Sequence, residues 1–175
     1  MQEAVEQEQR EPLFIAAGRP VYPFVATKEA VVRIANFLHT FPLATNSDMT
    51  DEQIFHFVVS PANVFVESGP ALIMLQDVEI GKAAHVGFVF WDRKVAGNDD
   101  LIVETLNRLM DMLHIHRYYT QVPEKNRTMI RMIERIGFVG EGRLREAFLL
   151  RSGEFCDIYV YGALKGELSV KHTAS

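Results

Sequence analysis

Two side chains near the middle of the chain could accept a proton during catalysis. His85 lies in the segment Ala84-His85-Val86-Gly87-Phe88, and Glu79 precedes it. An imidazole changes charge close to neutral pH, so His85 can act as a general base, directly or through a water molecule. A histidine hydrogen-bonded within a strand and a solvated carboxylate in a turn are the non-catalytic readings of these residues. His85 is therefore the first candidate base and Glu79 the second.

The other reactive residue types form weaker patterns. His114 and His116 have no third ligand at a suitable spacing, so we predict no metal site. Their position near the end of a helix explains them better. Cys156 is the only cysteine and is interpreted as a buried, unreactive thiol. The sequence has no Gly-x-Ser-x-Gly, Walker or dinucleotide-binding motif, so hydrolase, kinase and dehydrogenase classes lack support.

The bulk composition favours an intracellular globular protein. The 175 residues fit one domain, and 48% hydrophobic residues suffice for a core. A net charge of −5 argues against binding nucleic acid but permits a basic substrate. The single cysteine and the polar N-terminus predict a cytoplasmic location, and no apolar run is long enough to predict membrane insertion. We expect a flexible acidic arm over 1–11, one domain over 12–166 and a flexible tail over 167–175.

The periodicity of apolar residues predicts an α/β chain, of the α+β type with a mixed sheet. About seven strands and four helices are expected. In chain order they are interrupted strands over 12–26, helices over 28–41 and from Thr50 to near Pro61, strands over 63–67, 71–76 and 84–91, a helix over 99–114, a strand over 118–122, a helix over 126–136, and a hairpin with arms 138–150 and 155–164. The strand–helix–strand crossover predicts one parallel, right-handed pair within the sheet.

The C-terminal part of the chain carries the most specific pattern. Residues 126–138 begin with Asn and end with Gly-Phe, and Glu-Gly-x-Leu-Arg follows at 141–145. Gly-x-x-x-Asp at 153–157 and Tyr-x-Tyr at 159–161 complete the run. It resembles the GNAT superfamily of acyl-CoA-dependent N-acyltransferases, and within it the ribosomal-protein N-acetyltransferase branch. The order of predicted elements extends this resemblance over most of the chain.

The resemblance implies a GNAT fold and an acetyl-CoA-dependent N-acetyltransferase. The acetyl group would pass directly, in a ternary complex, to a primary amine of a small molecule or peptide. The parallel strands would splay at the end nearest Asn98 to admit the pantetheine arm. The resemblance also implies which residues contact the cofactor. They are the strand residues Phe88, Val89 and Phe90, the phosphate loop Arg93, Lys94, Val95, Ala96, Gly97, Asn98 and Asp99, and, on the helix over 126–136, Asn126, Arg127 and Arg131. Asn126 is equally well read as a helix cap, and the arginines as a solvated face.

The chain departs from the family pattern at several of these positions. Ala96 stands where the first loop glycine is expected, and Asp99 brings a negative charge to the phosphate site. Met129 and Ile133 occupy positions where relatives carry a proton donor. The departing thiolate would either leave unassisted and be protonated by water, or take a proton from a tyrosine elsewhere in the chain. The candidate tyrosines are Tyr118, Tyr119, Tyr159 and Tyr161.

These departures support a second hypothesis, in which the chain is a catalytically silent GNAT-like binding or structural module similar to some phage-encoded relatives. The hydrophobic hairpin over 144–164 could also pair with a second copy and form a homodimer.

Overall fold

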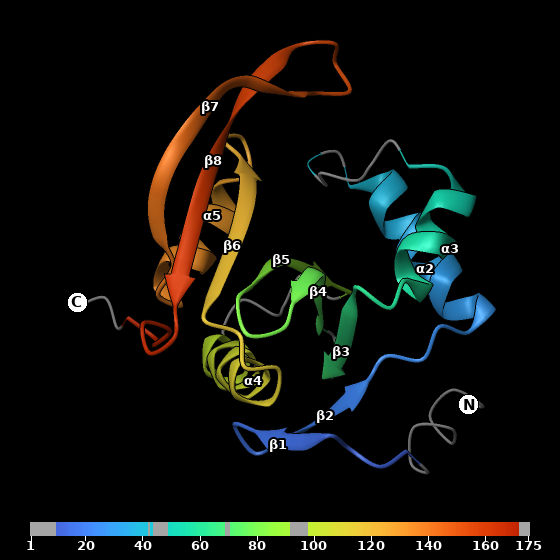
Figure 1. The fold of residues 1–175 in the computed structure, drawn as a ribbon. Coiled ribbons are helices and arrows are strands. Elements are labelled where there is room, and N and C mark those ends of the chain that lie inside the picture. Colours follow the sequence, from blue (N-terminus) through green and yellow to red (C-terminus); the bar gives the residue numbers. More distant parts are fainter. Residues whose placement is uncertain (1–9, 42, 44–48, 69–70, 92–97, 172–175) are drawn as a thin grey trace.

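The computed structural model describes residues 10–41, 43, 49–68, 71–91 and 98–171. Within them, eight strands form one mixed sheet in the order β1-β2-β3-β4-β5-β6-β8-β7, and four helices cover it (Figure 1). The elements are β1 (Phe14–Ala16), β2 (Arg19–Pro23), α2 (Lys28–Thr40), α3 (Asp51–Val59), β3 (Val64–Ser68), β4 (Ala71–Glu79), β5 (Ala83–Phe90), α4 (Asp99–Met112), β6 (Arg117–Pro123), α5 (Arg127–Arg135), β7 (Val139–Leu149) and β8 (Phe155–Leu164). The predicted class and the four helices are confirmed, and the strand number is eight where about seven were expected.

Two of the helices begin at the caps that the sequence indicates. The Thr27 hydroxyl accepts a hydrogen bond from the backbone N–H of Ala30 at 3.2 Å, which starts α2. Thr50 and Gln53 form a reciprocal capping box at the start of α3. Gly137 follows α5 with a φ of 104°, a conformation that favours glycine.

The sheet separates two apolar layers. Helices α4 and α5 cover one face, where Leu106, Leu109 and Ile133 are buried in the larger core. Helices α2 and α3 cover the opposite face over β3, β4 and the end of β5, where Ile34 and Ile54 pack in a second core. Figure 1 shows this second pair of helices beside β3 and β4, with the β7–β8 hairpin on the other side of the molecule.

The central strands β5 and β6 are the parallel pair that the sequence predicts. They are paired only from Ala83 to His85 on β5 and from Arg117 to Tyr119 on β6. Beyond His85 the two strands have no paired residues, although β5 continues to Phe90 and β6 to Pro123. The sheet is therefore split at the end nearest Asn98, as expected.

The β7–β8 hairpin is bent by two irregularities in β7. One lies at residues 140–142 and the other between Leu144 and Phe148. At the second, Glu146 has a left-handed φ of 51°, and its N–H donates to Asp157 Oδ1 at 2.8 Å. Arg143 pairs with the other carboxylate oxygen of Asp157. Asp157 of the Gly-x-x-x-Asp pattern thus holds the bend of the hairpin.

Replacing Asp157 with asparagine is expected to lower the Tm at pH 7, because the charged acceptor is lost. The hydrogen bond from Glu146 and the nearby Arg143 hold the pKa of Asp157 below its ordinary value of 3.8. A lowered folded-state pKa means that this stabilisation is complete above the ordinary value and disappears as the pH falls through the lowered one. The Tm difference between wild type and Asp157→Asn should therefore shrink in strong acid. Glu154→Gln on the same hairpin is the matched control, and a pH-independent difference would contradict the prediction.

Residues near both ends of the described chain contact the rest of the fold. Leu168 is 5% exposed, and the Lys171 N–H donates to the Arg135 carbonyl at 2.7 Å. At the other end, Arg10 Nη1 lies 2.6 Å from Glu67 Oε1. Contacts with the rest of the described chain therefore reach from Arg10 to Lys171, and the domain bounds 12–166 stay a prediction.

Candidate active site

His85 stands at the apex of the split between β5 and β6. It is the last residue of the parallel pairing, opposite Tyr119, and it also pairs with Gln76 of β4. The rings of His85 and Tyr119 meet edge to face with centroids 5.3 Å apart. Ala84 and Val86 are buried in the core under α4 and α5. Because side chains alternate along a strand, His85 points to the opposite face, on the side of α2 and α3.

The surroundings of His85 favour its neutral form. Its side chain is half-buried, and this burial lowers its pKa below the ordinary value, while the charge of Asp77 acts in the opposite direction. A neutral imidazole at pH 7 can accept a proton. The histidine is not sealed in the core, so the geometry is compatible with general-base chemistry at the split.

Glu79, the second candidate base, lies in a different place. It is at the end of β4, opposite Ala83, in the turn that leads into β5. Its side chain is 60% exposed, and Lys82 Nζ lies 2.6 Å from its Oε2. The structure therefore does not bring Glu79 to the apex of the split, and its carboxylate already has a cationic partner.

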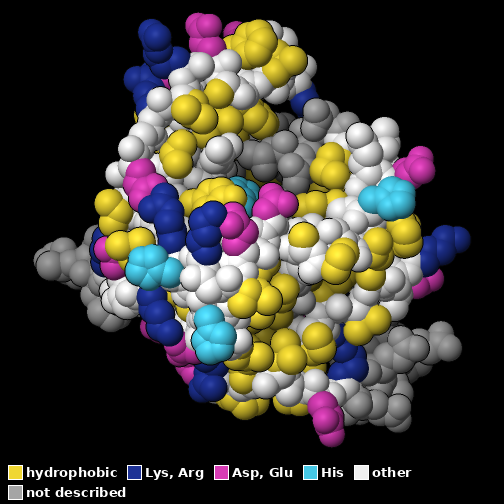
Figure 2. Space-filling view, viewed as in Figure 1, with side chains coloured by type: hydrophobic (Ala, Val, Ile, Leu, Met, Phe, Trp, Pro, Cys, Tyr) yellow, Lys and Arg dark blue, Asp and Glu magenta, His cyan; other side chains and the backbone are white. Residues whose placement is uncertain are grey.

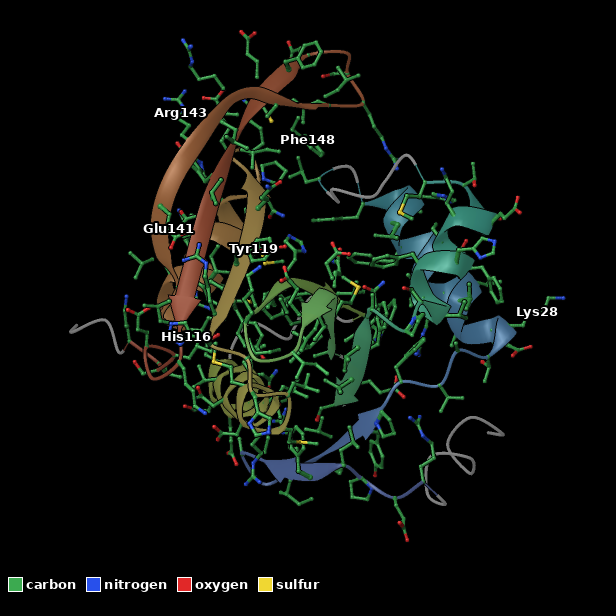
Figure 3. The ribbon with its side chains drawn as sticks, viewed as in Figure 1. Lys28, His116, Tyr119, Glu141, Arg143 and Phe148 are labelled. Atoms are coloured by element: carbon green, nitrogen blue, oxygen red, sulfur yellow. The ribbon has the colours of Figure 1, made fainter. Side chains whose placement is uncertain are left out.

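The face on which His85 lies is bounded by the hairpin as well as by α2 and α3. Phe148, Cys156 and Ile158 form a small apolar cluster with Leu43, which follows α2. Arg151 at the hairpin tip donates to the Leu38 carbonyl at 3.4 Å. Figure 3 shows the hairpin, with Phe148, arching toward the helices above the strand that carries Tyr119, and Figure 2 shows that this face of the molecule is hollowed between hairpin and helices. The hairpin therefore closes one end of the hollow.

The strand residues expected along the cofactor are packed into the two cores. Phe88 is buried under α4 and α5 and stacks on Phe90, with centroids 6.3 Å apart. Val89 is buried on the opposite face with α2 and α3. Only the backbone of this part of β5 is left to face the split, because its side chains are committed to packing. The split can thus offer unpaired backbone N–H and C=O groups to a polar, extended arm such as pantetheine.

The start of α4 is occupied by the chain's own side chains. Arg93, Lys94, Val95, Ala96 and Gly97 lie outside the described residues. Asn98 accepts a hydrogen bond from Arg19. The Asp99 side chain is 14% exposed and forms a two-point ion pair with Arg135. Nε of Arg135 donates to Asp99 Oδ2 at 2.7 Å, and Nη2 donates to Oδ1 at 3.2 Å. A carboxylate and an arginine therefore meet where the resemblance implies a phosphate, a pairing that the sequence did not reveal.

The residues expected on α5 divide into two groups. Asn126 is buried, and its Oδ1 accepts from the Met129 N–H at 3.3 Å, so its helix-cap role is confirmed. Arg127 and Arg131 are exposed, and neither forms an ion pair with any described residue. They remain available to an anionic ligand, whereas the third arginine of the series, Arg135, is already engaged.

Only one of the four candidate tyrosines lies on the face of His85. The Tyr118 hydroxyl donates to the Leu106 carbonyl at 3.1 Å, and burial raises the pKa of Tyr118. The Tyr161 hydroxyl donates to Glu134 at 3.0 Å, and burial with this carboxylate raises the pKa of Tyr161 to about 12. Tyr159 packs against the same core under α4 and α5. Tyr119 is the exception, beside His85.

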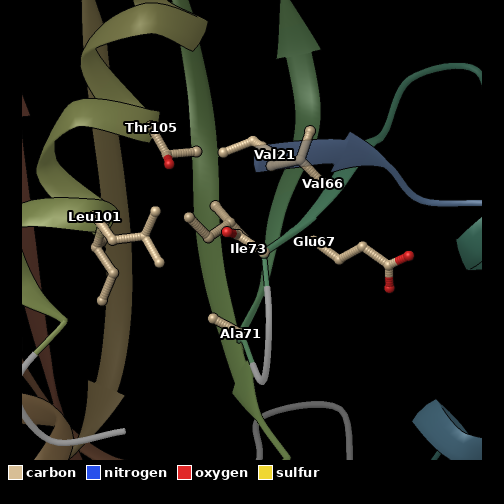
Figure 4. Close-up of a pocket in the computed structure, with 9 residues that line it drawn as sticks. Val21, Val66, Glu67, Ala71, Ile73, Leu101 and Thr105 are labelled. Atoms are coloured by element: carbon tan, nitrogen blue, oxygen red, sulfur yellow. The ribbon is translucent and has the colours of Figure 1, made fainter. Parts of the chain in front are cut away.

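The cavity in Figure 4 is too small to be a substrate site. Its volume is about 10 Å³, room for no more than one water molecule. It lies between α4 and the β2–β4 strands, with Val21, Ile73 and Thr105 in its wall. The Thr105 hydroxyl is buried and has no hydrogen-bond partner among the described residues. The described residues also contain no group of three or more potential metal ligands and no helix long and apolar enough to cross a membrane.

Comparisons with known proteins identify the fold. No protein-family model matches the chain, and no curated protein matches it in sequence. Among solved structures, a chimera built on the spermidine N-acetyltransferase SpeG of Vibrio cholerae has a TM-score of 0.67 and 19% identity, covering 83% of this chain and 95% of its own. The Vibrio cholerae enzyme in complex with CoA and spermine has a TM-score of 0.65 and 18% identity, covering 84% and 96%. The chain therefore has the fold of these acetyltransferases, as the sequence resemblance predicts.

Proposed function

We propose that the chain is an acetyl-CoA-dependent N-acetyltransferase that acts on a primary amine by direct transfer in a ternary complex. The observation that carries the proposal is the split between β5 and β6, with a half-buried histidine at its apex. The split leaves backbone groups free on one side, and His85 faces the hollow on the other. An acyl donor and an amine can thus approach the same point from opposite directions.

The chemistry follows from the residues at the apex. Acetyl-CoA supplies an activated thioester carbonyl. His85 removes the proton from the acceptor ammonium, directly or through water, so that the amine nitrogen can form the new N–C bond. Unpaired backbone N–H groups of β5 donate to the carbonyl oxygen as negative charge develops on it. As the C–S bond breaks, the nitrogen releases its second proton to water. Tyr119 is the best-placed tyrosine to protonate the departing thiolate, since it adjoins His85, and it regains its proton from water.

Several finer features belong to the same proposal. The hairpin tip that meets the end of α2 favours a small-molecule amine over a protein chain as acceptor. Spermidine is the substrate named for the Vibrio cholerae enzyme, and a small amine is the acceptor class proposed here. The C-terminal motif supports a place near the ribosomal-protein branch, and the reduced Cys156 supports a cytoplasmic location. Exposed Leu144, Leu149 and Phe155 on the hairpin support a homodimer.

A silent GNAT-like module is the second candidate function. It is favoured by the Asp99–Arg135 pair, because the Asp99 carboxylate at the start of α4 competes with a phosphate for the same place. It is also favoured by Ile133, which is fully buried and stands where relatives have a donor. In this reading the fold is retained for binding or assembly, and acetyl-CoA is not a ligand.

Acetyl-CoA is expected to raise the Tm of the purified protein in a thermal-shift assay. A ligand at 100 times its Kd stabilises the native state by about 2.7 kcal/mol, which corresponds to a rise of roughly 5–11 °C for a domain of this size. Sodium sulfate at equal concentration controls for non-specific anion effects. No shift with acetyl-CoA or CoA at about millimolar concentration would overturn the enzyme proposal and leave the silent module.

A further inference from the structure

Strand β4 carries a bulge immediately beside His85. The antiparallel pairing with β5 is regular as far as Gln76 and His85, then shifts before Glu79 meets Ala83. Within the bulge, Asp77 has a left-handed φ of 50°. A non-glycine residue adopts this conformation at some energetic cost, and such bulges re-aim side chains next to functional sites. The Asn63 side chain accepts from the Asp77 N–H at 3.1 Å and holds the bulge in place.

Asp77 carries a negative charge that has no ion-pair partner among the described residues of the strands around His85. Apart from tyrosines, the charged or titratable residues on β4, β5 and β6 are Asp77, Glu79, His85 and Arg117. Glu79 is paired with Lys82, and Arg117 with Glu141. Asp77 is exposed and forms no ion pair with any residue in the described ranges. Gln76, the residue before Asp77, is the pairing partner of His85, so Asp77 and His85 occupy adjoining positions on neighbouring strands. The charge of Asp77 acts to raise the pKa of His85, against the larger lowering effect of burial.

We infer that Asp77 is the binding residue for the ammonium group of the acceptor, which it holds beside His85. This inference rests on the proposed function and adds the residue that recognises the substrate. A primary amine is protonated at neutral pH, and an exposed carboxylate without a partner attracts it. His85 at the neighbouring position then takes the proton, because its imidazole is neutral. The acceptor is a small primary amine with a cationic end, and a neutral analogue of the same shape is not held.

The test compares Asp77→Asn with wild type, using spermidine and 2-phenylethylamine as probes. Asparagine also tolerates a left-handed φ, so the bulge is preserved and the charge alone is removed. The KM for each amine should rise roughly tenfold, the effect of losing one charge-assisted contact at an exposed site. The KM for acetyl-CoA should stay unchanged. Added salt should raise the amine KM of wild type and have little effect on the variant.

The pH profile gives a readout that a merely structural role would not change. Without the Asp77 charge, the pKa of His85 falls, so the acidic limb of kcat/KM should move to lower pH. Glu52→Gln on α3, where the side chain is 86% exposed, is the matched control and should behave as wild type. Calorimetric titration of both amines into the CoA-saturated protein measures binding without turnover. Equal amine affinity in wild type and Asp77→Asn, or no amine binding by wild type, would overturn the inference. Failure of acetyl-CoA to bind would instead overturn the proposed function.

Discussion

Replacing His85 with alanine should lower kcat/KM for acetyl transfer by roughly 10²–10⁴, the usual loss when a general base is removed. The imidazole lies at the apex of the β5–β6 split, where the unpaired part of each strand begins. Its side chain faces the hollow beside α2 and α3, and the affinity for CoA should therefore barely change. Steady-state kinetics with a confirmed amine acceptor, together with the CoA thermal shift, separate the two effects.

The control for this substitution is His56→Ala. His56 lies on α3 with its side chain 71% exposed, so its loss should leave both kinetics and Tm near wild type. In the wild-type protein, the acidic limb of kcat/KM for the proposed reaction should lie below the ordinary pKa of histidine, because burial lowers the pKa of His85. Undiminished activity in His85→Ala would remove this residue from the mechanism. An ordered water would then be the next candidate base, because Glu79 lies away from the apex and is paired with Lys82.

Replacing Ile133 with alanine should lower the free energy of unfolding more than the other substitutions proposed for this protein. Ile133 is completely buried in the core between α5 and the sheet. Truncating such a residue costs about 2–5 kcal/mol through lost burial and the cavity left behind. For a domain of this size the Tm should fall by roughly 4–20 °C. Differential scanning calorimetry at neutral pH measures the change.

A matched pair of variants on α5 makes this result specific. Arg131→Ala removes an exposed side chain two residues away and should change the Tm by less than about 2 °C. Ile133→Tyr would place a proton donor at this position, but the site is fully packed. Overpacking costs about 1–3 kcal/mol, and the variant should lose stability without gaining activity. A stable, more active Ile133→Tyr enzyme would show that the sequence had lost a donor that the fold still accommodates.

Local sequence signals account for the parts of the fold that were predicted correctly. Caps at Thr27 and Thr50 depend on residues three positions away, so a short window contains the whole interaction. The parallel pair follows from the strand–helix–strand order, because consecutive strands joined by a helix have few alternative arrangements. His85 could be chosen as a candidate base because an imidazole titrates near neutral pH, and its catalytic role stays a prediction.

The features that the sequence did not reveal depend on distant contacts or on breaks in the pattern. Asp99 and Arg135 meet only because α4 and α5 pack on the same face of the sheet, and no local rule connects two residues 36 positions apart. The bulge at Asp77 interrupts an otherwise regular alternation and leaves no mark in the residue types around it. Tyr119 is distinguished from the other tyrosines only by how the side chains pack in the folded protein.

The three residue pairs that join β5 to β6 also bear on the order in which the chain folds. Strands β1 to β5 are consecutive antiparallel neighbours in the sheet, whereas β6, β8 and β7 form a separate antiparallel group. Most strand pairs within each group are joined by short connections, so little chain entropy is lost when they form. The pairing of β5 with β6 instead spans the whole α4 connection and costs more chain entropy. We therefore expect the two groups of strands to assemble independently and the parallel junction to form last, so that the apex at His85 is among the final parts of the molecule to become ordered.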